Sequence, residues 1–195
     1  MKQLVKKCGF YFAIILLATG CASPEPPETP KPKGYFRIEV PEAAYQTLDT
    51  TLPFRFNYSQ YAVCKFERKP ENTIWLYLSY PQFNADLNIT YLQLHNDLHE
   101  RIIAENELIT NHYKMADDVE YSIIDAPEQH IFGQIYDIKG KSVACPLSFW
   151  MTDSVQHYFR GSLYFNHAPN NDSVQPLIDF IREDVLQLIE TFEWK

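Results

Sequence analysis

Residues 73–94 read TIWLYLSYPQFNADLNITYLQL. The first part, Thr73–Ser79, is rich in aromatic and β-branched residues, which is typical of a β-strand. The second part, Ala85–Leu94, alternates apolar and polar residues as a half-buried strand does. Pro81 and Asn84 interrupt the pattern and mark a turn. Because a short turn joins the two segments, the stretch predicts a pair of antiparallel strands.

Strand patterns continue on both sides of this hairpin. Phe54–Tyr58 alternates cleanly, which predicts another half-buried strand. Before it, Gly34–Val40 is expected to be extended, and Pro41–Thr51 is interpreted as irregular. The other predicted strands are Tyr61–Phe66, Glu120–Ala126, His130–Lys139, Ser142–Thr152 and His157–Asn166. The last two are expected to pair across Asp153 and Ser154.

Two segments have helical periodicity. Apolar residues recur at helical spacing from Asn96 to about Met115, with Asn96 or His95 as the start. A longer apolar stripe runs from Ser173 to Glu193, where Asp172 or Ser173 can cap the helix. Pro176 fits this helix if it lies in the first turn.

The order of these elements is strands, one helix, strands, one helix. Short turns between strands favour a mainly antiparallel sheet, and the two long helices are expected to cover it. The chain is therefore predicted to be an α+β protein, and its element order resembles Mog1/PsbP domains. Residues 34–195, about 160 residues, are enough for one domain with a substantial core.

Residues 1–20 have the three parts of a secretory signal peptide. A lysine-containing start is followed by the apolar run Cys8–Ala18, which is shorter than the roughly twenty residues that span a membrane. Ala18-Thr19-Gly20-Cys21 resembles the bacterial lipobox, with Ala18 where leucine is usual. We therefore expect lipidation of Cys21 and attachment to a bacterial membrane. The alternative is a secreted protein in which Cys21 is an ordinary thiol.

Residues 21–33 are expected to be a linker, because Ala22–Lys33 contains five prolines and no large apolar residue. Such a segment favours an extended polyproline conformation. It is interpreted as a spacer that holds the domain in the periplasm, and the alternative is a docking peptide for a proline-binding groove.

The charge of the chain excludes one broad class of partner. The formal net charge is −8, and removal of residues 1–20 deletes three lysines and no acidic residue, which leaves −11. A surface of this sign disfavours nucleic acid as a partner.

Two cysteines remain after the signal peptide and Cys21 are set aside. Cys64 and Cys145 form an even pair in an exported protein, so a disulfide between them is one expectation. The other is two buried thiols that act as small apolar side chains. A disulfide would require Cα atoms within about 7 Å.

No catalytic motif stands out, and no enzyme activity or cofactor is expected. His95 and His99 are four residues apart and could ligate zinc from one helix face. However, the sequence is not HExxH or HxxEH. A solvated polar face is the preferred interpretation, and a metal-dependent hydrolase is the least favoured hypothesis. Trp75, Trp150 and Trp194 could form a binding platform, although core packing is their usual role.

The segment KPKGYFRI at residues 31–38, followed by Pro41 and Tyr45, resembles the start of the GldD family of gliding-motility lipoproteins of Bacteroidetes. The resemblance extends more loosely over nearly the whole mature chain. It implies an accessory, non-enzymatic role in gliding and type IX secretion, through contacts with other envelope proteins. The expected contact surface contains basic and aromatic residues in an otherwise acidic molecule: Lys31, Lys33, Tyr35, Phe36 and Arg37. The alternative function is binding of a small molecule or peptidoglycan fragment in an aromatic pocket.

Overall fold

A computed structural model describes residues 38–112 and 114–195. The expected signal peptide, Cys21, the linker and the segment from Lys31 to Arg37 lie outside the described residues. None of the helices in the described residues has the length and apolar character needed to cross a bilayer.

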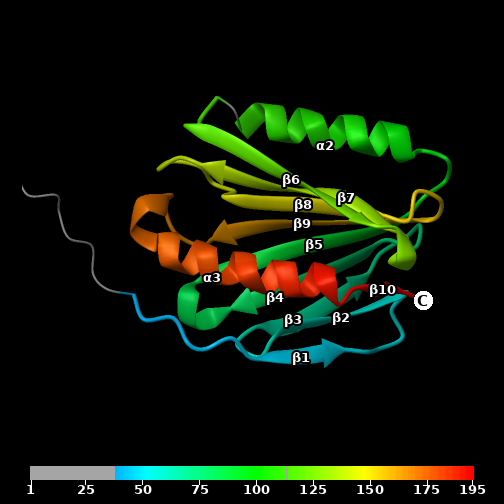
Figure 1. The fold of residues 1–195 in the computed structure, drawn as a ribbon, viewed down its shortest axis with the longest axis horizontal. Helices are drawn as coiled ribbons and strands as arrows, with labels where there is room; N and C mark the ends of the chain where they lie inside the picture. The colour runs from blue at the N-terminus through cyan, green and yellow to red at the C-terminus, as the bar shows by residue number, and fades with distance from the viewer. Residues whose placement is uncertain (1–37, 113) are drawn as a thin grey trace, which may run out of the picture. The chain divides into compact units, whose positions relative to one another are not determined.

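Seven strands form one antiparallel sheet in the order β3-β4-β5-β9-β8-β7-β6 (Figure 1). Their bounds are β3 Val63–Arg68, β4 Ile74–Tyr80, β5 Ala85–Gln93, β6 Asp118–Ala126, β7 Ile131–Lys139, β8 Leu147–Thr152 and β9 His157–Phe165. The hairpin predicted at residues 73–94 is β4 and β5. The short 3₁₀ helix η1, Pro81–Phe83, joins them and ends at Asn84 in the left-handed region, which asparagine tolerates. A second one, η2 (Pro127–Gln129), joins β6 and β7.

A smaller sheet contains β1 (Tyr45–Leu48), β2 (Phe54–Ser59) and β10 (Glu193–Trp194) in the order β1-β2-β10. The interpretation of Pro41–Thr51 as irregular was therefore wrong in part. β1 is a strand because all four of its residues pair with β2. The partner β2 follows after only five residues, but a strand of four residues is too short to show a clear alternating pattern.

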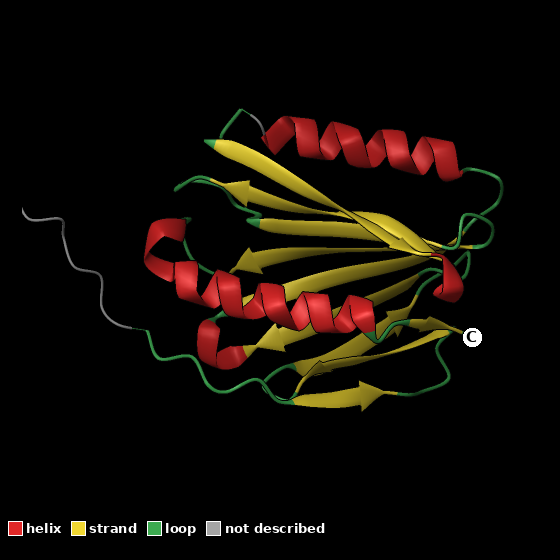
Figure 2. Cartoon of the chain, in the orientation of Figure 1, coloured by secondary structure: helices red, strands yellow, loops and turns green. Residues whose placement is uncertain are grey.

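The main core lies between the large sheet and α3, Asn171–Glu190 (Figures 1 and 2). Alternate residues of the strands point toward α3, whose Ile181, Val185 and Leu188 are buried against them. Phe192 follows the helix and contacts Phe159 at a ring-centroid distance of 4.9 Å. The predicted apolar stripe of the last helix therefore packs on one face of the sheet.

The other helix, α2 (Leu98–His112), packs on part of the opposite face. Its Ile109 joins a second core with Tyr136, Trp150 and Tyr158. Ile103 and Leu108 remain exposed, so α2 buries a narrower stripe than α3 does.

The predicted α+β class, with a mainly antiparallel sheet and two long helices, is confirmed. Several boundaries differ, and two of them matter most. β8 begins at Leu147 rather than Ser142. α3 begins at Asn171, whose buried side chain donates hydrogen bonds to the carbonyls of Gly140 and Val143. As a result Pro176 is the sixth residue of α3, in the second turn rather than the first.

Candidate functional site

The expected disulfide is not formed, because Cys64 and Cys145 are both free. Cys64 lies on β3, and Cys145 lies two residues before β8. Four strand-to-strand steps separate β3 from β8, which is roughly 19 Å at 4.8 Å for each step. Burial raises the pKa of both thiols to about 11. Cys145 fits the alternative of a buried thiol that acts as a small apolar side chain, whereas Cys64 is only half-buried.

His95 and His99 do not share a helix face. His95 lies before α2, where its backbone N–H donates to Asp97 Oδ1 at 2.8 Å, whereas His99 is in the first turn. Within the part of the chain that the structure describes, no three His, Cys, Asp or Glu side chains are grouped so that they could hold a metal ion.

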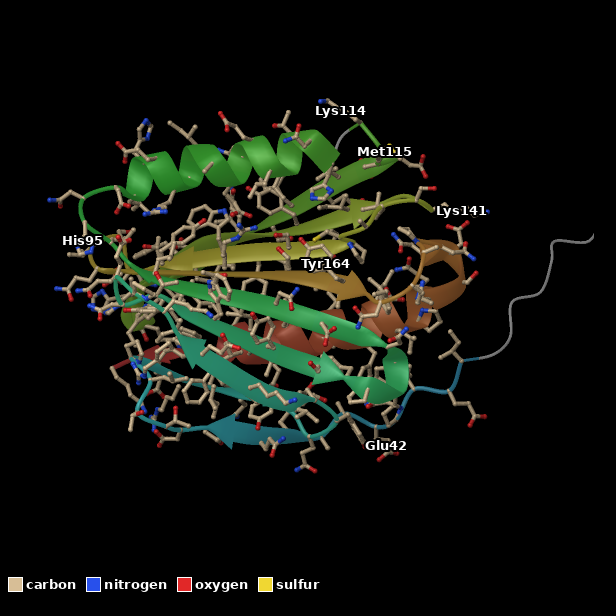
Figure 3. The ribbon with its side chains drawn as sticks, turned by 180° about the vertical axis from the view of Figure 1, so that it is seen from behind. Glu42, His95, Lys114, Met115, Lys141 and Tyr164 are labelled. Atoms are coloured by element: carbon tan, nitrogen blue, oxygen red, sulfur yellow. The ribbon has the colours of Figure 1, made fainter. Side chains whose placement is uncertain are left out.

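The sheet face opposite α3 is left partly uncovered by α2. Three aligned rows of side chains cross it, and together they make a surface that we call the open face. From β4 through β5 to β9 the rows are Trp75–Thr90–Arg160, Tyr77–Asn88–Ser162 and Ser79–Asp86–Tyr164. Figure 3 views this side, with Tyr164 toward the viewer and α2 along the upper margin.

Aromatic rings are the main apolar groups of the open face. Trp75 is 42% exposed, Tyr164 is 38% exposed, and Tyr77 is half-buried between their rows. The Lys69 ammonium lies 4.4 Å from the centre of the Trp75 ring, a cation–π contact that also restrains the indole. The same ammonium pairs with Glu67 at 2.6 Å.

One buried ion pair marks the border between the open face and α2. Glu105 of α2 is 2% exposed, and its Oε2 lies 3.1 Å from Arg160 Nε and 3.5 Å from the Tyr158 hydroxyl. Burial raises the pKa of Glu105, and the Arg160 guanidinium opposes this effect. Removal of Arg160, whose side chain is 30% exposed, would leave the buried Glu105 carboxylate without its counter-ion, so the pair helps to hold α2 beside the open face.

A hollow lies at His157, where the ends of several strands meet. Its ring stacks on Trp194 at a centroid distance of 4.9 Å, and its Nδ1 lies 2.8 Å from the Tyr91 hydroxyl. Pockets of about 490 and 460 Å³ lie on the two sides of this residue. Burial acts to raise the pKa of Asp153, but backbone N–H donors from His157 and its two predecessors lower it overall. The carboxylate thus holds the β8–β9 turn that positions His157. We call the two pockets beside His157 together the strand-end pocket.

The three tryptophans do not form one platform. Trp150 is buried under α2, Trp194 lines the strand-end pocket, and Trp75 is on the open face. The alternation in residues 73–79 places Trp75 and Tyr77 on one side of a strand, but it does not say whether a helix covers that side. The open face and the strand-end pocket were therefore both missed from the sequence.

Comparison with known proteins adds two findings. The family model described as "Gliding motility lipoprotein GldD" matches residues 25–194. The solution structure of cyanobacterial PsbP (CyanoP) from Synechocystis sp. PCC 6803 is similar over 82% of this chain and 97% of its own, with 13% sequence identity and a TM-score of 0.44. No curated protein sequence matches the chain.

Proposed function

The chain belongs to the gliding motility lipoprotein GldD family, and on this premise we propose that it is an accessory component of the gliding and type IX secretion machinery. Lipid on Cys21 holds it on a membrane, residues 22–33 act as a spacer, and the domain faces the periplasm. Its role is to bind other envelope proteins rather than to catalyse a reaction.

The open face is the observation that supports this role. Tryptophan and tyrosine are the residues most often found at the energetic centres of protein interfaces. Trp75 and Tyr164 present rings to solvent on the same sheet face, with the half-buried Tyr77 between their rows.

The dimensions of the open face fit the centre of an interface. Its three rows span four residue steps along the strands and two steps between strands, or roughly 14 by 10 Å. This is smaller than the approximately 800 Å² that each partner buries in a standard interface. The contact must therefore extend beyond these three rows, and α2 is the neighbouring element that it would reach.

Complementation of a deletion strain tests the proposal. We expect a Trp75→Ala, Tyr77→Ala variant to reach the membrane and fold, but to fail to restore gliding and secretion. A Val40→Ala, Met115→Ala variant is the matched control, because it truncates two exposed apolar side chains that lie away from the open face and outside the strand-end pocket. Full restoration by the first variant would show that the open face is not the contact surface.

The segment Lys31–Arg37 is proposed as a second contact, next to the membrane spacer. A Tyr35→Ala, Arg37→Ala variant tests it in the same strain. Restored movement and secretion in that variant would remove this segment from the account and would leave the open face untouched.

The strand-end pocket favours one alternative, the binding of a small molecule or peptidoglycan fragment. Soluble peptidoglycan fragments are a suitable probe. A ligand at 100 times its dissociation constant should stabilise the fold by about 2.7 kcal/mol. A rise in melting temperature that disappears in His157→Ala would favour this alternative, and no rise would count against it.

A further inference from the structure

The outer strand β6 is an edge that is open to pairing. It stands at one end of the seven-stranded sheet and pairs with β7 over all nine of its residues without a bulge. Six of the nine residues are exposed, including Tyr121 at 61% and Ile123 at 71%. In Figure 1 β6 runs diagonally below α2, and no helix is drawn across it. In an antiparallel pair every second residue directs its N–H and C=O groups away from the partner strand, so about half of β6 offers unpaired backbone groups.

The two edges of the sheet are protected to different degrees. Proteins discourage pairing at exposed edges with charged side chains, above all lysine, and with proline or bulges. The other edge strand, β3, carries Lys65, Glu67 and Arg68 within six residues. By contrast, the centre of β6 is Tyr121-Ser122-Ile123-Ile124, which has no charge, and the strand contains neither lysine nor proline.

The sequence of β6 is complementary to itself in one antiparallel register. If Ser122 of one copy lies opposite Ser122 of another, all nine residues find a partner. Tyr121 then lies opposite Ile123 on both sides of the centre, and aromatic–aliphatic pairs of this kind stabilise sheets. Asp118 meets Ala126, Glu120 meets Ile124, and Asp125 meets Val119. No acidic side chain lies opposite another.

Other registers are less favourable. In a register shifted by one residue, a residue whose N–H and C=O groups point toward the other copy would lie opposite one whose groups point toward β7. An antiparallel ladder does not allow such a pair. A shift by two residues keeps the alternation but centres the pair on Tyr121 or on Ile123. The register centred on Tyr121 brings Asp125 opposite Asp117. The register centred on Ile123 brings Asp118 opposite Glu128. Both shifts also shorten the pairing.

We infer that two copies of this chain associate through β6, antiparallel about Ser122, so that their large sheets become continuous. The association is symmetric, because every contact occurs twice across the two-fold axis. It uses a surface separate from the open face, and it does not depend on the proposed role in gliding.

Cysteine cross-linking of the full-length protein in its membranes tests the register. In Ser122→Cys the two Cα atoms would be about 4.5–5.5 Å apart, within the range of a disulfide. Glu120→Cys is the matched control on the same edge, because the two copies of position 120 would be roughly 14 Å apart. We expect mild oxidation to convert most of the Ser122→Cys protein to a dimer that reducing agent dissolves. The Glu120→Cys protein should form such a dimer at a rate at least tenfold lower.

A second substitution tests the apolar pair. Ile123→Lys places a charge on a side chain that is already 71% exposed, so the fold should persist, and dimer formation by Ser122→Cys should fall at least tenfold. Val155→Lys, at a side chain that is 67% exposed in the β8–β9 turn, adds the same charge as a control and should have no effect. Absence of a Ser122→Cys dimer, equal cross-linking at positions 120 and 122, or cross-linking of Ser122→Cys to a different protein would each overturn the inference.

Discussion

The substitution Asp184→Asn should change how the stability of the domain depends on pH. Asp184 lies on α3, is 3% exposed, and accepts a hydrogen bond from the Tyr80 hydroxyl at 3.1 Å. Burial raises its pKa from the ordinary 3.8 to about 6, against the opposing effect of the hydroxyls of Ser59, Tyr80 and Tyr45. Burial therefore outweighs these hydrogen bonds, and the folded protein favours the protonated carboxyl group up to about pH 6.

The sign and size of the effect follow from proton linkage. Between pH 3.8 and about 6 the folded state keeps the proton that the unfolded chain has released. The folded state thus binds more protons, and the free energy of unfolding falls as pH rises through this window. At about 1.36 kcal/mol for each pH unit, the full loss is about 3 kcal/mol. Between pH 4 and pH 7 it is about 2 kcal/mol.

Urea unfolding of the purified protein at pH 4, 5, 6 and 7 measures this loss. The free energy of unfolding of Asp184→Asn, relative to wild type, should increase by about 2 kcal/mol from pH 4 to pH 7. Subtraction of the wild-type values removes the titration of other groups. Asp179→Asn removes the same charge from an exposed position on α3 and is the matched control. A difference between Asp184→Asn and wild type that stays constant with pH would refute the reasoning.

Two further predictions concern packing and anchoring. A Cβ atom at Gly133 would lie 2.0 Å from the carbonyl oxygen of Trp150. Because that oxygen belongs to the backbone of β8, it cannot move aside easily. Gly133→Ala should therefore lower the free energy of unfolding by about 3 kcal/mol, the upper end of overpacking penalties. Urea unfolding checks this, and a cost below about 0.5 kcal/mol would contradict the placement of β7 against β8. Cys21→Ser should move the protein from the membrane to the soluble fraction, with loss of the lipid mass. A variant that stays in the membrane would remove the lipid anchor from the proposal.

The local pattern of the chain was sufficient to predict most strands and both helices. The hairpin of β4 and β5 could be found because the first strand is rich in aromatic and β-branched residues, the second alternates regularly, and Pro81 and Asn84 separate them. α3 could be found because its apolar stripe continues for the whole helix. These signals depend on neighbouring residues alone.

The features that could not be predicted depend on residues far apart in the chain. β10 has two residues and exists because Glu193 and Trp194 pair with Arg55 and Phe54. The insertion of β9 between β5 and β8 separates the strands near Cys64 and Cys145, which a count of cysteines cannot reveal. The open face depends on how much of the sheet α2 covers, and α2 is held there by contacts between distant residues such as Glu105 and Arg160. The strand-end pocket likewise joins β5, β9 and β10 around His157.

Photo-cross-linking in living cells tests the central claim most directly. A photoreactive amino acid at Tyr164 would sample the open face, and one at Glu183, exposed on α3, would sample the other side of the sheet. We expect the probe at Tyr164 to capture a protein of the gliding or secretion machinery that the probe at Glu183 does not capture. The same products from both positions, or none from Tyr164 in cells that glide normally, would contradict the account.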